Sequence, residues 1–73
     1  IMEMEEQIER LTQKIRSLID GDELITFSKL VQGIKKIEQI RTFIILLFMA
    51  QNEKVTLWQD EDFNEIFITL NGG

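Results

Sequence analysis

Among its 73 residues the chain has no cysteine and no histidine, and these two absences remove much of enzyme chemistry. Without these residues there is no disulfide, no thiolate or imidazole metal ligand, and no Ser–His or Cys–His catalytic pair. The four glycines form no phosphate-binding loop pattern. We therefore expect no catalytic residue, no metal site, no cofactor and no enzymatic activity.

Positive charge is scarce as well. Eight Lys and Arg residues stand against 13 Asp and Glu residues, which gives a formal net charge of -5 and a pI of about 4.6. A chain with this balance repels the phosphate backbone of nucleic acids. Nonspecific nucleic-acid binding is therefore not expected.

Long hydrophobic runs are also missing. The longest one, Phe43 to Ala50, is far shorter than the roughly 20 residues that cross a bilayer. The N-terminal stretch is acidic where a signal peptide would be basic, so neither membrane attachment nor targeting is expected. A chain of this length predicts a single domain, residues 1–73. Its start at Ile1 leads us to expect a fragment of a longer protein.

The acidic stretch near residue 60 does not complete a calcium loop. Asp60, Asp62 and Asn64 match the first three ligand positions of such a loop. The turn position, however, requires glycine and is Glu65, while the bidentate position requires glutamate and is Asn71. Calcium binding is not expected.

Hydrophobic spacing predicts a first helix from about Met2 to Ile19. Apolar residues recur in it at steps of four and three, which places them on one face. The segment Asp20-Gly21-Asp22 is predicted to end this helix. The members of the apolar face are Met4, Ile8, Leu11, Ile15 and Leu18.

The remaining chain predicts short elements separated by turn residues. They are a brief strand at Leu24–Thr26, a short helix Phe27–Gln32 capped by Thr26 or Ser28 and ended at Gly33, a third helix Lys36–Gln51, a turn at Asn52-Glu53, a strand Val55–Gln59, an acidic loop Asp60-Glu61-Asp62, and a strand Glu65–Leu70.

This order of elements is that of a winged helix-turn-helix, an α+β fold with three helices and a C-terminal β-hairpin wing. Many such domains bind DNA through the third helix. That use needs long polar side chains on the helix and basic residues on the wing. Here the third helix is mostly apolar and the wing tip is Asp60-Glu61-Asp62. Direct DNA binding by this domain is therefore not expected.

The third helix is apolar on nearly every side, so more than one of its faces must be covered. We expect the first helix and the sheet to bury one broad face. The residues of that face are Ile37, Ile40, Phe43, Ile44 and Leu47.

The opposite face of the same helix supplies the first candidates for a partner site. Ile45 and Phe48 would form an exposed apolar patch next to Arg41, unless the hairpin or the first helix covers them. On the predicted wing, Trp58 and Phe67 either support the sheet or contact a partner that pairs with the hairpin edge. The exposed apolar residues could also support self-association.

Several residues stand in the order and spacing typical of one protein family. They are Phe27, Leu30, Ile40, Thr42-Phe43, Leu46-Leu47, Val55, Gln59, Phe63 and Ile66. In these positions the chain resembles the C-terminal winged-helix domain of bacterial segregation and condensation protein A, the kleisin of the SMC complex. The resemblance covers nearly the whole chain and is strongest from Phe27 onward.

The resemblance implies a non-enzymatic interaction domain. It would bind the ATPase head of an SMC protein and help to close the SMC–kleisin ring in chromosome condensation and segregation, in the cytoplasm at the nucleoid. Other subunits would bind the N-terminal part of the longer kleisin. Ile45 and Phe48 stand where relatives usually have a small and an acidic residue, so the binding face would be unusually apolar. The alternative is a winged-helix transcription regulator, or its dimerisation domain.

Overall fold

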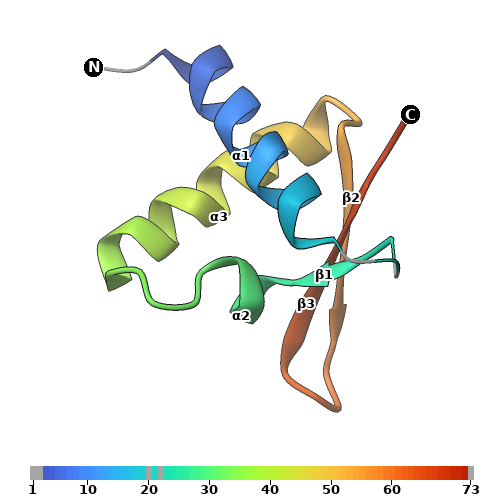
Figure 1. Cartoon of the computed structure of the whole chain (residues 1–73). Helices are drawn as coiled ribbons and strands as arrows, with labels where there is room; N and C mark the ends of the chain where they lie inside the picture. Colours follow the sequence, from blue (N-terminus) through green and yellow to red (C-terminus); the bar gives the residue numbers. More distant parts are fainter. Residues whose placement is uncertain (1–2, 20, 22, 73) are drawn as a thin grey trace.

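The computed structural model describes residues 3–19, 21 and 23–72 and has the element order expected for a winged helix. Met2, Asp20 and Asp22, which took part in the predicted limits of the first helix, lie outside the described residues. The predicted α+β fold is confirmed (Figure 1). The described elements are α1 (Met4–Leu18), β1 (Ile25–Thr26), α2 (Phe27–Leu30), α3 (Lys36–Gln51), β2 (Val55–Asp60) and β3 (Glu65–Leu70).

The sheet is antiparallel, with β3 between β1 and β2. Because side chains alternate along a strand, each strand offers one face to the helices and one to the outside. Val55 and Ile68 belong to the buried core, whereas Trp58 and Phe67 are paired across the strands on the other face. The loop between β2 and β3 projects away from the helices as the wing (Figure 1).

Helix α1 packs on the rest of the domain with its predicted apolar face. Leu11 and Ile15 are buried in the core, and Ile8 and Leu18 pack against it, while Met4 near the first turn is exposed. The polar residues of α1 point to solvent, as a helix with one narrow apolar stripe requires. The predicted face of α1 is confirmed.

The short helix α2 begins at a side-chain cap. The hydroxyl oxygen of Thr26 accepts a hydrogen bond from the backbone N–H of Lys29 at 3.2 Å. This contact satisfies one of the N–H groups that have no partner within the helix. Gly33 follows the helix with φ +81°, a conformation that suits glycine. Of the two predicted caps, Thr26 is the one that forms.

Helix α3 ends in a Schellman turn. The N–H of Lys54 donates to the carbonyl of Met49 at 2.8 Å, and the N–H of Glu53 donates to that of Ala50 at 3.0 Å. Glu53 has φ +61°, in the position where glycine is commonest. The turn places β2 immediately after the helix, as the predicted turn at Asn52-Glu53 required.

The predicted core face of α3 is wrong. Ile37, Ile40, Ile44 and Leu47 are exposed, and the buried residues of the helix are Ile45, Leu46 and Met49. Phe43 is half-buried and meets the ring of Phe27 edge-on, with the ring centroids 5.9 Å apart. Both faces of this helix carry large apolar residues at steps of three and four, so the hydrophobic spacing could not distinguish the buried face from the exposed one.

A pair of neighbouring leucines tests this assignment of faces. Leu46→Ala should lower the free energy of unfolding by about 2–5 kcal/mol, because it leaves a cavity at a fully buried site. Leu47→Ala removes the same atoms from an exposed site and should cost less than about 1 kcal/mol. Urea denaturation followed by circular dichroism measures both values, and equal losses would contradict the assignment.

A carboxylate links the start of β3 to α2. Burial raises the pKa of Glu65, but hydrogen bonds from Ser28 and from the backbone N–H of Ile66 outweigh this effect and hold the pKa below its ordinary value. The backbone N–H groups of Ser28 and Ile66 reach Glu65 Oε2 at 3.3 and 3.0 Å. The ionised carboxylate is therefore favoured by the fold.

Glu65 should make the stability of the domain depend on acid pH. Because its pKa is lower in the folded chain, its contribution is present above the ordinary value of 4.5 and is lost as the pH falls through the folded pKa. Glu65→Gln should therefore reduce the loss of stability between about pH 5 and pH 3. Urea melts at several pH values test this, and parallel curves for the variant and the parent chain would contradict it.

Candidate protein-interaction surface

Helix α3 carries a row of exposed apolar side chains, which we call the α3 stripe. Its members recur at steps of three, four, three and one, so they share one side of the helix. Each side chain is 44 to 59% exposed. The stripe consists of Ile37, Ile40, Ile44, Leu47 and Phe48.

The α3 stripe is not explained by the packing of this domain. A surface helix normally turns polar residues to solvent, and large contiguous apolar patches mark interaction sites. Next to the stripe, Arg41 and Glu38 form an ion pair at 3.0 Å, so the apolar row has a charged border. This arrangement has the apolar centre and polar rim that are typical of a protein interface.

The wing tip presents an aromatic side chain among carboxylates. Asp60 Oδ1 accepts hydrogen bonds from the N–H groups of Asp62 and Phe63 at 3.0 and 3.4 Å, and Asn64 has φ +52°. The turn leaves the side chain of Phe63 77% exposed. A wing that contacts DNA carries basic residues at its tip. The tip of this wing is acidic instead and exposes one apolar side chain.

Trp58 and Phe67 form a stacked pair on the outer face of the sheet. Their ring centroids are 5.8 Å apart and the rings are 18° from parallel. Trp58 is exposed and Phe67 is half-buried. Strand β2 pairs only with β3 among the described strands, so its other edge lies open beside the two rings.

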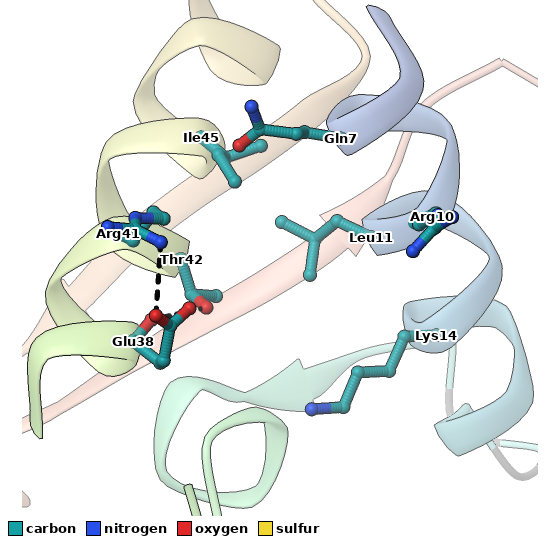
Figure 2. Close-up of a pocket in the computed structure, with 8 residues that line it drawn as sticks. All are labelled: Gln7, Arg10, Leu11, Lys14, Glu38, Arg41, Thr42 and Ile45. Atoms are coloured by element: carbon teal, nitrogen blue, oxygen red, sulfur yellow. Dashed lines mark hydrogen bonds and ion pairs between the residues drawn. The ribbon is translucent and has the colours of Figure 1, made fainter. Parts of the chain in front are cut away.

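A groove of about 710 Å³ lies between α1 and α3 (Figure 2). Leu11 and Ile45 form its apolar part, and charged side chains from both helices surround them. The lining residues are Gln7, Arg10, Leu11 and Lys14 from α1 and Glu38, Arg41, Thr42 and Ile45 from α3.

The five residues predicted for a partner site lie in three places. Phe48 belongs to the α3 stripe, Arg41 and Ile45 line the groove, and Trp58 and Phe67 form the aromatic pair. Of the two alternatives for Ile45, an exposed patch or cover by the first helix or the hairpin, the structure has the covered one, since Ile45 is 8% exposed and part of the core. It faces α1 because α3 is rotated relative to the predicted packing. The binding roles of all five stay predictions.

Sequence reasoning missed most of the α3 stripe, because it assigned Ile37, Ile40, Ile44 and Leu47 to the core. The signal was present: a helix that is apolar on all sides has more apolar surface than one small core can cover. The exposure of Phe63 at the wing tip was likewise not predicted. Its position after an acidic turn, outside the alternation of the two strands, could have indicated it.

The described part of the chain offers little for other kinds of site. Residues 3–19, 21 and 23–72 contain no cluster of three or more acidic side chains placed to hold a metal ion. Of the described helices, none has the length and hydrophobicity needed to cross a membrane.

Comparison with known proteins identifies the family. The family model described as "Segregation and condensation protein ScpA" matches residues 1–71. The chain belongs to the ScpA family. Segregation and condensation protein A of Bacillus velezensis is 28% identical over 61 residues, which make up 84% of this chain and 24% of that relative. The chain thus spans about a quarter of the length of this ScpA protein.

A solved ScpA structure confirms the winged-helix fold. It is described as the crystal structure of the SmcHead bound to the C-winged helix domain of ScpA. The TM-score is 0.79 at 27% sequence identity, and the match covers 94% of this chain and 100% of the other. The resemblance inferred from the spacing of residues in the sequence is therefore confirmed, and it extends to the ScpA C-terminal domain.

The surface predicts weak interaction with DNA. The exposed side of α3 is mostly apolar, with Lys36 and Arg41 as its basic residues, and the wing tip is acidic, so the two elements that a DNA-binding winged helix uses offer phosphates little positive charge. Fluorescence anisotropy with a labelled duplex at physiological salt should detect no tight complex. A Kd of about 1 μM or below would contradict this prediction.

Proposed function

We propose that this chain is the C-terminal winged-helix domain of a kleisin, which binds the ATPase head of an SMC protein and helps to close the SMC–kleisin ring. The domain acts without enzymatic activity of its own, in the cytoplasm at the nucleoid. Support comes from the related ScpA domain, which was crystallised bound to an SMC head and matches nearly all of this chain. Chromosome condensation and segregation is the corresponding cellular process.

The α3 stripe is the observation that carries this proposal. Completing the burial of five half-exposed apolar side chains contributes about 1 kcal/mol each. The sum, several kcal/mol, helps to offset the cost of association, so the stripe can be a main contributor to an interface. A DNA-binding transcription regulator would need a basic stripe along α3 and basic residues on the wing, whereas α3 carries an apolar row with only Lys36 and Arg41 as basic residues, and the wing tip carries carboxylates.

The aromatic pair offers a second contact on the same partner. Trp58 is the larger exposed ring, and Phe67 supports it from the neighbouring strand. The open edge of β2 can pair with a strand of the SMC head, since unpaired backbone groups are a ready template for strand addition. In this arrangement Phe48 and the rest of the stripe supply apolar contact and β2 supplies backbone hydrogen bonds.

Substitutions in the α3 stripe test the proposal. Ile44→Glu and Leu47→Glu should each weaken binding to the SMC head at least tenfold, because an unpaired charge would be buried in an apolar interface. Both sites are exposed in the free domain, so folding should persist. Isothermal titration calorimetry with a purified SMC head measures the affinity, and circular dichroism checks the fold.

Gln13→Glu is the matched control, since it adds the same charge at an exposed site of α1. It should leave the affinity unchanged. Phe48→Arg belongs with the stripe variants, whereas Ile45→Glu does not, because Ile45 is buried and a charge there would unfold the domain. Folded Ile44→Glu and Leu47→Glu variants that bind as tightly as the parent chain would place the interface elsewhere, with Trp58→Ala as the next variant to measure.

A further inference from the structure

The groove between α1 and α3 is positively charged in an otherwise acidic domain. Of the eight basic residues in the chain, three line this groove, whereas only one of the 13 acidic residues does. The basic side chains are those of Arg10, Lys14 and Arg41, and the acidic one is that of Glu38. The local balance is therefore opposite to that of the whole chain.

Two of these positive charges have no counter-ion within the described residues. Glu38 Oε1 lies 3.0 Å from Nη1 of Arg41 and neutralises that guanidinium. Arg10 and Lys14 lie one helical turn apart on α1 and form no ion pair with any described side chain. Figure 2 shows Lys14 extending into the space between the two helices.

Between the charges the groove is apolar. Leu11 from α1 and Ile45 from α3 meet there, and each is 8% exposed. Thr42 is beside them, and its hydroxyl already donates to the carbonyl of Glu38 at 2.8 Å. The groove thus suits a segment with carboxylates on either side of an apolar residue, rather than a purely polar ligand.

A second groove on α1 provides a comparison. It is lined by Glu5 and Glu9 together with Arg16 and Lys54, so its charges balance. A third groove, where α1 meets the end of β3, does have basic residues in excess, Arg16 and Lys54, but no residue of α3 lines it. The groove between α1 and α3 borders the candidate interface, because Arg41 lies one helical turn from Ile37 and Ile44 of the stripe, and a partner covering the stripe would reach it.

We propose that the groove between α1 and α3 binds an acidic segment of the SMC head, with its carboxylates at Arg10 and Lys14 and an apolar side chain on Leu11 and Ile45. This inference rests on the proposed function. A protein segment fits better than DNA, because an extended phosphate backbone would meet the net charge of -5 and the acidic wing. The groove steers and orients the head while the α3 stripe supplies apolar contact.

Charge reversal on α1 tests the proposal. Lys14→Glu should weaken binding of the purified SMC head about 3- to 10-fold at 50 mM salt, and the pair Arg10→Glu with Lys14→Glu should weaken it further. The effect should shrink at 500 mM salt, since ions screen exposed charges. Calorimetry gives the affinities, and circular dichroism confirms that these exposed substitutions leave the domain folded.

Arg16→Glu is the matched control, because it makes the same change of charge on the same helix but lies outside the groove between α1 and α3. It should change the affinity less than about twofold. Equal weakening by Arg16→Glu and Lys14→Glu would mean that only net charge matters and would overturn the proposal, as would an unchanged affinity for the Lys14→Glu variant.

Binding of the unsubstituted chain to the SMC head distinguishes a failure of the proposed function from a failure of the groove proposal. If it does not bind the SMC head, the proposed function fails and the groove proposal fails with it. If the parent binds and the stripe variants weaken binding while Lys14→Glu does not, the proposed function stands and only the groove proposal is overturned. Binding of a DNA duplex that is lost in Lys14→Glu, with head binding intact, would assign the groove to nucleic acid instead.

Discussion

The packing of α3 between α1 and the sheet is the contact on which this domain depends. Leu46 and Met49 are fully buried and join Ile15 of α1 to Ile68 of the central strand. Few other interactions could compensate for the loss of this contact, because a domain of this size has only one small core. Once these residues are turned inward, the helical period turns the opposite side of α3 outward, and the α3 stripe is the result.

The two long helices show how far hydrophobic spacing can predict structure. Helix α1 has one apolar stripe on a polar background, and its buried residues Leu11 and Ile15 were predicted. Helix α3 was predicted with its correct bounds, Lys36–Gln51, but with the wrong face inward. Its length follows from local sequence, whereas its rotation is decided by neighbours that are distant along the chain. The spacing of apolar residues therefore predicts that they will be buried. Whether they are buried inside the domain or against a partner is decided by the packing of the whole fold.

The candidate site was predictable in kind but not in position. That the chain presents apolar surface which its own small core does not cover could be expected from a third helix that is apolar on nearly every side. The groove did not follow, because its charges come from Arg10 and Lys14 on one helix and Arg41 on another, about 30 residues later. Pairing of Trp58 with Phe67 required the register of two strands. Such combinations depend on the fold as a whole.

The Schellman turn after α3 has a mechanical consequence. Only the three residues Asn52, Glu53 and Lys54 separate the helix from β2, and the N–H of each donates to a carbonyl in the last turn of the helix. Because these hydrogen bonds hold every residue of the connection, we expect α3 and the hairpin to keep a fixed relative orientation. A partner that binds α3 would then also set the direction of the wing.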